Sequence, residues 1–220
     1  MKKIMFNDRY GLTGAVLRGD KTMTRRIIPD IEIDWNRRGR VTLPISGFEH
    51  GVLFMDVRSI LHDAGIFDYS APAKYQPKYE IGEEVAIAQP YKNDDVLTYN
   101  VYNEDGTARE DGLQRHKEML ESKGYRNKMF VKSEYMPHRI RITGIKAERL
   151  QDISEENCIK EGLLVGEQEP RMYGFRLPKG AVLSFLTPRE AFAALIDRIS
   201  GRGTWQSNPW VYVYTFELIK

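Results

Sequence analysis

Four segments of the chain carry the hydrophobic pattern of β-strands, in which apolar residues alternate with polar ones or β-branched and aromatic residues follow one another. The segment His138–Glu148 also places arginine on its polar face. The segment Trp210–Ile219 is the longest run of aromatic and β-branched residues. The predicted strands are Lys3–Phe6, Val85–Ile87, His138–Glu148 and Trp210–Ile219.

Helical periodicity and end signals predict four helices. In the helix at Pro188–Ser200, apolar residues at helical spacing follow the capping box Thr187–Glu190. Glycine or serine marks the ends of two other helices. Gly19 ends the first helix, and Ser154 and Gly162 bound the third. The predicted helices span Asp8–Arg18, Gly112–Glu121, Ser154–Glu161 and Pro188–Ser200.

Strands separated by a few helices, without a repeating strand-helix-strand rhythm, predict an α+β domain built on a curved or closed sheet. We expect a single domain over residues 1–220 with two insertions. The first, at about 30–78, has mixed composition and is expected to carry at most a hairpin. The second, at about 92–126, is polar and is expected to be partly helical.

Composition narrows the class of protein. With 41% hydrophobic and 29% charged residues the chain is expected to fold into a globular domain, and no run of about 18 apolar residues predicts a membrane span. The net charge of +2 means that any site for a polyanion must be a local cluster. One cysteine, Cys158, and four scattered histidines predict no disulfide, metal or cofactor. The single cysteine fits a reducing compartment, so we expect a cytoplasmic protein. We also expect a monomer.

The densest group of functional side chains directly follows the predicted first helix. The block Gly19–Arg26 supplies an ammonium group, two threonine hydroxyls and two guanidinium groups. If it is extended, Lys21 and Thr24 fall on opposite faces, so a turn is needed to bring them together. On local evidence a solvated basic face that complements the helix dipole explains the block better than a site does.

This block resembles the GxKxxxxR signature of the ASCH domain family, small PUA-like β-barrel proteins thought to bind RNA or nucleotides. Here the signature is Gly19, Lys21 and Arg26, with Thr24 inside it. Later elements follow in the same order as in the family. The Asn-Pro-Trp-Val sequence that leads into the last strand resembles the same segment in larger phage and bacterial members. These elements are Tyr79, Gly82 and Glu83, the basic strand Arg139–Lys146, the helix ending at Glu161-Gly162, and Asn208–Val211. The resemblance implies a PUA-like barrel with helices on its rim.

Some members of that family are described as amidohydrolases of N4-acetylcytidine and others as ribonucleases. The resemblance places their working lysine, threonine and glutamate on Lys21, Thr24 and Glu161, with Glu155 and Glu156 as alternatives one to two turns earlier. Thr24 could be the nucleophile with Lys21 as its base, or Lys21 could stabilise an oxyanion while Glu161 activates water. The sequence leaves both mechanisms open.

We rank three functions. The first is binding of RNA or a modified nucleoside without chemistry, because the insertions depart from the compact amidohydrolase pattern. The second is the hydrolase, and the third is an interaction module in phage or mobile-element biology.

The positive charge of Arg139 and Arg141 is explained equally well by an outward-facing strand edge as by contact with RNA. The residues predicted to bind substrate or RNA are Gly19, Arg25, Arg26, Arg139 and Arg141. Convergence of Lys21, Thr24 and Glu161 on a nucleoside-sized pocket would favour catalysis.

Overall fold

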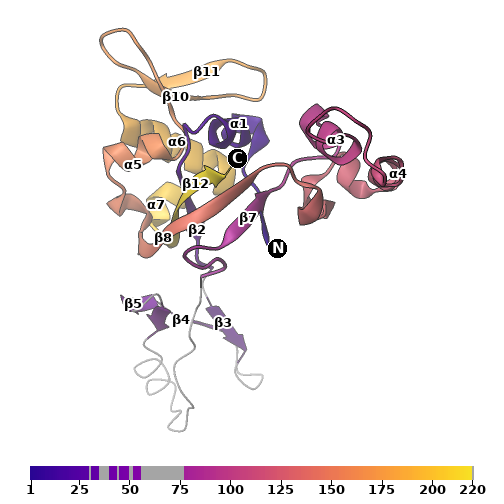
Figure 1. The fold of residues 1–220 in the computed structure, drawn as a ribbon. Helices are drawn as coiled ribbons and strands as arrows, with labels where there is room; N and C mark the ends of the chain where they lie inside the picture. The colour runs from indigo at the N-terminus through magenta and orange to yellow at the C-terminus, as the bar shows by residue number, and fades with distance from the viewer. Residues whose placement is uncertain (30, 35–39, 44, 50–51, 56–76, 220) are drawn as a thin grey trace.

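The main element is a five-stranded mixed sheet (Figure 1). The computed structural model describes residues 1–29, 31–34, 40–43, 45–49, 52–55 and 77–219. The sheet has the order β1-β7-β8-β12-β2, and only the β1–β7 pair is parallel. The strands are β1 (Lys3–Ile4), β2 (Met23–Ile27), β7 (Glu84–Ile87), β8 (Arg139–Arg149) and β12 (Trp210–Ile219). All four predicted strands are therefore confirmed, and β2 is added from the basic block.

The α+β class is confirmed, and among the described strands β1 and β2 are the open edges of the sheet. Strands β8 and β12 are its longest pair, with a bulge at Thr215/Phe216 opposite Gly144. A Cβ on Gly144 would lie only 2.6 Å from the Thr215 hydroxyl oxygen, so this glycine lets the strands approach. The alternation in β8 buries Ile140 and Ile142 completely.

Helices cover one face of the sheet and enclose the main core. The elements are η1 (Asp8–Tyr10), α1 (Leu12–Leu17), η5 (Leu150–Asp152), α5 (Glu155–Lys160), α6 (Pro188–Ser200) and α7 (Thr204–Ser207). The predicted bounds of α6 are confirmed, and α5 is one residue shorter at each end than predicted, with Ser154 and Glu161 as its caps. The Thr187–Glu190 capping box is also present. The helix predicted over Asp8–Arg18 is wrong as one element, because Gly11, at φ 71°, divides η1 from α1.

Loss of the capping box is expected to weaken α6 measurably. The Thr187 side chain accepts a hydrogen bond from the Glu190 amide, and the Glu190 carboxylate accepts one from the Thr187 amide. Thr187→Ala should therefore lower the free energy of unfolding by about 1 kcal/mol in urea denaturation. Arg202→Ala, an exposed site just after the helix, should change it by less than about 0.5 kcal/mol. Equal stability of the two variants would contradict the role of the cap.

A small three-stranded sheet was not predicted. It comprises β9 (Leu164–Val165), β10 (Tyr173–Arg176) and β11 (Val182–Phe185), in the order β11-β10-β9. Its strands are short, and the polar and glycine-rich residues between them hide the alternation. Phe175 from β10 is buried in the main core and meets Tyr10 edge to face at 5.8 Å, which fixes this sheet above α1 and α6.

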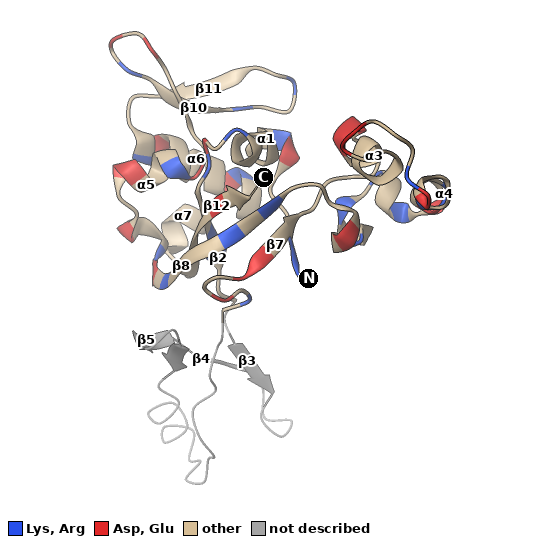
Figure 2. Ribbon diagram, in the orientation of Figure 1, with Lys and Arg blue, Asp and Glu red and all other residues tan. Residues whose placement is uncertain are grey.

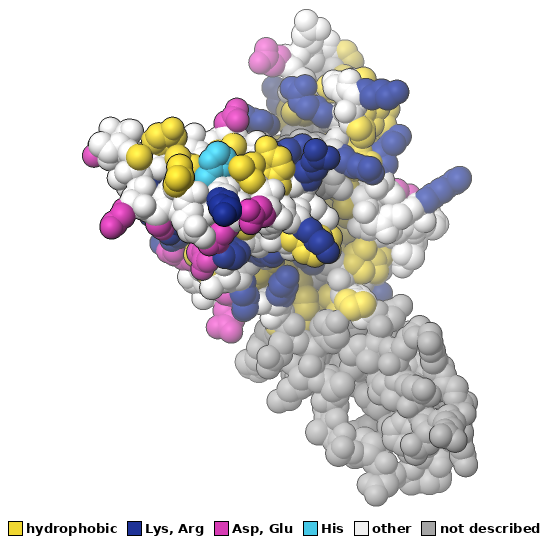
Figure 3. Space-filling model, turned by 90° about the vertical axis from the view of Figure 1, so that its right-hand side faces the viewer, with side chains coloured by type: hydrophobic (Ala, Val, Ile, Leu, Met, Phe, Trp, Pro, Cys, Tyr) yellow, Lys and Arg dark blue, Asp and Glu magenta, His cyan; other side chains and the backbone are white. Residues whose placement is uncertain are grey.

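The second insertion forms a helical subdomain with its own small core. It contains α3 (Asp94–Val101), α4 (Gly112–Glu121), and the single turns η2 (Lys123–Tyr125), η3 (Lys128–Phe130) and η4 (Ser133–Tyr135). Helix α4 has the predicted bounds, whereas α3 was not predicted. Tyr91, Val96, Met119 and Met136 are buried between these helices and the end of β7. Hydrophobic side chains also lie beside Lys and Arg on the outer face of the subdomain (Figure 3).

The first insertion contains two antiparallel strand pairs, so the expectation of at most one hairpin is wrong. The pairs are β3 (Ile31–Asp34) with β4 (Arg40–Leu43), and β5 (Ile45–Glu49) with β6 (Val52–Met55). The rest of the insertion predicted at 30–78 lies largely outside the described residues. Among the residues that are described, no helix has the length and apolar character needed to span a membrane.

Candidate functional site

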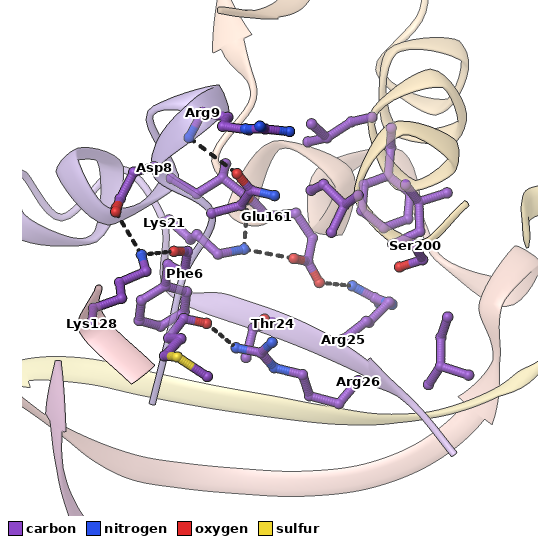
Figure 4. A pocket seen from close by; sticks show the side chains of 18 residues that line it. Phe6, Asp8, Arg9, Lys21, Thr24, Arg25, Arg26, Lys128, Glu161 and Ser200 are labelled. Carbon is purple, nitrogen blue, oxygen red and sulfur yellow. Dashed lines mark hydrogen bonds and ion pairs between the residues drawn. The ribbon is translucent and has the colours of Figure 1, made fainter. Parts of the chain in front are cut away.

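A cavity of about 610 Å³ lies between the start of the chain, β2 and α6 (Figure 4). Its walls combine apolar side chains of α6 with a group of charged side chains. This volume is within the range of about 300–1,000 Å³ that is usual for small-ligand pockets. The polar and charged side chains that line it are Asn7, Asp8, Arg9, Lys21, Thr24, Arg25, Arg26, Lys128, Glu161 and Ser200.

Two glycine turns bring Lys21 and Glu161 together. Gly19, at φ 82°, ends α1, and the Lys21 amide then donates to the Ala15 carbonyl. At the end of α5, Gly162 has φ 97°, and a Cβ there would lie 3.2 Å from the Lys21 Cβ. Because both positions favour glycine, the end of α5 can approach the start of β2 closely.

Lys21 and Glu161 form a buried ion pair. The Lys21 Nζ donates to Glu161 Oε2 at 2.6 Å and to the Glu161 main-chain oxygen at 2.7 Å. Their side chains are 2% and 6% exposed, respectively. Burial lowers the pKa of Lys21 below 10.5, more than the Glu161 carboxylate raises it. Glu161, and not Glu155 or Glu156, is therefore the glutamate at the cavity.

Arg25 holds the other side of Glu161. Its Nη1 donates to Glu161 Oε1 at 2.9 Å, while Nη2 and Nε donate to Glu148 Oε1 at 2.6 and 3.1 Å. Burial acts to raise the pKa of Glu148, but hydrogen bonds from Lys146 and Arg25 outweigh it and the pKa is lowered. Arg25 was predicted to contact RNA or substrate. Its buried guanidinium lines the cavity and binds two carboxylates of this protein.

These contacts form a row of alternating charge, which we call the charge row: Lys146, Glu148, Arg25, Glu161 and Lys21. It begins at the half-exposed Lys146, whose Nζ lies 2.5 Å from Glu148 Oε2, and ends in the cavity wall. Each interior member has an opposite charge on both sides. The row therefore holds the Glu161 carboxylate in a fixed orientation.

Thr24 lines the same cavity from the opposite face of β2. It is buried and pairs with Tyr214 across the sheet, while its neighbour Arg25 points toward α5. Within the described part of the chain, its hydroxyl makes no hydrogen bond with Lys21 or Glu161. The three predicted catalytic residues thus share a cavity, but only two of them are in contact.

Three cations that are more exposed than Lys21 and Arg25 also line the cavity: Arg9, Arg26 and Lys128. The Arg26 Nη2 donates to the Met5 main-chain oxygen at 2.6 Å. Lys128 Nζ donates to the Phe6 carbonyl and lies 2.8 Å from an Asp8 carboxylate oxygen (Figure 4). Sequence reasoning missed Lys128, because it belongs to a segment 122 positions from Phe6 and carries no local signal.

The remaining predicted binding residues lie elsewhere. Gly19 shapes the turn and does not line the cavity. Arg141 donates to Glu84 at 3.2 Å and to Glu217 at 3.0 Å, and Arg139 lies 4.0 Å from Glu84. Figure 2 shows this basic face of β8 beside the acidic end of β7. The structure therefore places Arg139 and Arg141 in ion pairs at the strand surface.

Among the residues described, no group of three His, Cys, Asp or Glu side chains could hold a metal ion. Cys158 is buried, and burial raises its pKa to about 12, which keeps it a thiol at neutral pH. The polar side chains that line the cavity therefore include the Lys21–Glu161 pair and the hydroxyls of Thr24 and Ser200. No family model, curated protein or solved structure matches the chain.

Proposed function

We propose that this protein is a hydrolase that cleaves an acyl amide on a nucleobase, such as the acetyl amide of N4-acetylcytidine. The observation that carries this proposal is the buried Lys21–Glu161 pair in the wall of a cavity large enough for a nucleoside. A buried charged pair at the wall of a cavity is more typical of a catalytic site than of a purely electrostatic RNA surface.

A PUA-like fold is part of the same proposal. The resemblance of the Gly19–Arg26 block to the ASCH signature is supported by the mixed sheet with helices over one face. Strands β1 and β2 are the sheet edges, and the Arg26–Met5 hydrogen bond joins β2 to the residue that directly follows β1. A side-chain contact across the open edges suits a sheet that curves toward a barrel.

The chemistry follows from the two oxygens of Glu161 and the ammonium of Lys21. Glu161 accepts a proton from water as the water oxygen bonds to the acyl carbon. Lys21 donates a hydrogen bond to the oxyanion that forms on the former carbonyl oxygen. Glu161 then returns the proton to the exocyclic nitrogen as the carbon–nitrogen bond breaks, which releases the amine and a carboxylic acid. Arg25 orients Glu161 throughout.

Thr24 is assigned to substrate binding in this mechanism. Its hydroxyl lines the cavity without a bond to the Lys21–Glu161 pair, so water activated by Glu161 is the better-supported nucleophile. The alternative, in which Thr24 attacks the acyl carbon, requires an acylated threonine. The two mechanisms therefore differ in whether the protein carries an acyl group during turnover.

Turnover of N4-acetylcytidine by Thr24→Val tests the function and the mechanism together. We expect the wild type to release cytidine and acetate. Thr24→Val should retain turnover within about tenfold, because it loses one hydrogen bond to substrate. Mass spectrometry should find no acetylated intermediate. Absence of wild-type turnover would reject the hydrolase, and an acetyl group on Thr24 would reject water as the nucleophile.

Binding without chemistry is the second candidate function. It is favoured by two cations that line the cavity and pair with no carboxylate among the described residues, Arg9 and Arg26. Neutralising phosphate groups with these side chains would make the affinity for RNA fall as salt rises. Salt-sensitive binding of single-stranded RNA, in the absence of any turnover, is the result that would support this function over the hydrolase.

A further inference from the structure

A second cavity, of about 260 Å³, adjoins the first along the open edges of the sheet. Met5, Arg26 and Ile27 line both cavities, so they form a shared rim. Met5 and Ile27 are 37% and 38% exposed, which leaves this rim open to solvent. A ligand held in the first cavity can therefore extend across Arg26 into the second.

The charged lining of the second cavity is entirely basic. Lys3, Arg26 and Lys78 contribute to it, and none of its lining residues is acidic. None of the three cations has a carboxylate partner within the described ranges. Burial, and then the charge of Lys78, lower the pKa of Lys3. Positive charge is thus concentrated here without the counter-charges that neutralise Arg139 and Arg141.

Hydrogen bonds hold two of these cations, Lys3 and Arg26, in place. Lys3 Nζ donates to the carbonyls of Met129 and Val131, both at 2.7 Å. Arg26 Nη2 is bonded to the Met5 carbonyl, and its other guanidinium nitrogens make no hydrogen bond among the described residues. Lys78 is exposed, and its Nζ lies 5.5 Å from the centre of the Tyr79 ring. Donors that are fixed before binding lose little entropy on contact with an anion.

Two buried tyrosines, Tyr79 and Tyr214, also line the second cavity. The Tyr79 and Tyr214 rings meet edge to face with their centres 5.2 Å apart. The Tyr79 hydroxyl donates to the Lys3 carbonyl, and the Tyr214 hydroxyl accepts from the Lys78 amide. Since these hydroxyls are engaged within the protein, the tyrosines contribute a rigid wall. The cations supply the binding groups.

We propose that the second cavity binds a phosphate group attached to the substrate nucleoside, so that the substrate is a nucleotide or a nucleotide unit of RNA. The anion site rests on the lining of the second cavity alone. Its assignment to the substrate rests on the proposed function of the first. In this arrangement the acylated base lies beside Lys21 and Glu161, and Arg26 bridges to the phosphate.

A binding experiment tests the site without requiring turnover. By calorimetry at low salt, the wild type is expected to bind cytidine 5′-monophosphate about tenfold more tightly than cytidine, the effect of charge-assisted hydrogen bonds. Lys78→Ala should remove most of this preference and leave the affinity for cytidine unchanged. The matched control is Lys179→Ala, an exposed lysine between β10 and β11, which should keep the full preference. Equal affinity of the wild type for both ligands, or equal loss in both variants, would overturn the phosphate site.

A turnover experiment distinguishes failure of this inference from failure of the proposed function. The substrates are N4-acetylcytidine, its 5′-monophosphate, and a trinucleotide with acetylated cytidine at its centre. A higher kcat/KM for either phosphorylated substrate, lowered by Lys78→Ala, supports the site, and the better of the two identifies the phosphate source. Turnover indifferent to phosphate overturns the site but not the hydrolase. Phosphate-dependent binding without turnover supports the site and rejects the hydrolase.

Discussion

Glu161→Ala is expected to lower the free energy of unfolding by about 3–5 kcal/mol, because it leaves buried cations without their shared carboxylate. Glu161 contacts Lys21 and Arg25, whose side chains are 2% and 1% exposed. In this variant Arg25 would still contact Glu148, so most of the lost stability comes from Lys21, which loses its carboxylate partner. Urea denaturation followed by circular dichroism measures the change.

Two further variants separate the buried pair from general effects on α5. Glu156→Ala removes a glutamate from the same helix whose side chain is 75% exposed and paired with Lys160, and should change stability by less than about 0.5 kcal/mol. Lys21→Met combined with Glu161→Gln removes both charges at similar volume and should recover most of the lost stability. A single Glu161→Ala variant as stable as the wild type would contradict the buried pair.

Lys21→Met is expected to lower kcat for N4-acetylcytidine by about 10²–10³-fold, the usual loss when a hydrogen-bond donor to an oxyanion is removed. The loss should appear in kcat, because the oxyanion is absent from the bound substrate and forms only as water adds to the acyl carbon. Stability should change much less than in Glu161→Ala, since the remaining carboxylate still contacts Arg25. Lys160→Met, an exposed lysine on α5, is the matched control and should retain full activity.

The pH dependence of stability gives an independent check on Lys21. Its pKa is lowered below 10.5 in the folded protein, so in the alkaline range just below 10.5 the unfolded chain binds a proton that the folded chain does not. Stability due to Lys21 therefore increases as pH rises through this range. Relative to Lys21→Met, the wild type should become more stable as the pH rises toward 10.5. A difference that shrinks with rising pH would show that the pKa is not lowered.

Local signals in the sequence predicted the frame of the site well. Ser154, Thr187 and Gly162 act through hydrogen bonds and backbone angles within a few residues, so the ends of α5 and α6 follow from neighbouring residues. The long strands β8 and β12 follow from their alternation and aromatic content. Helix α3 was missed because only two of its residues, Val96 and Asn100, are buried, which leaves little apolar periodicity.

The roles of individual site residues depend on distant parts of the chain. Arg25 meets Glu148, 123 positions away, and only the pairing of β2, β12 and β8 brings the two together. A pattern that lists basic residues cannot distinguish an arginine committed to internal carboxylates from one that is available to a ligand. Arg25 and Arg26 are neighbours in the sequence, but Arg25 binds two internal carboxylates, whereas Arg26 lines both cavities and pairs with no carboxylate among the described residues.

The charge row also determines how substitutions in this protein combine. A substitution at Glu148 removes a charge that Arg25 contacts, and a substitution at Arg25 removes a charge that Glu161 contacts. The stability effects of substitutions at these interior positions should therefore be strongly non-additive. Substitutions in the charge row should therefore preserve stability best when two contacting residues change together. An engineer who transfers the site to another scaffold must likewise move β2, β8 and the end of α5 as one unit.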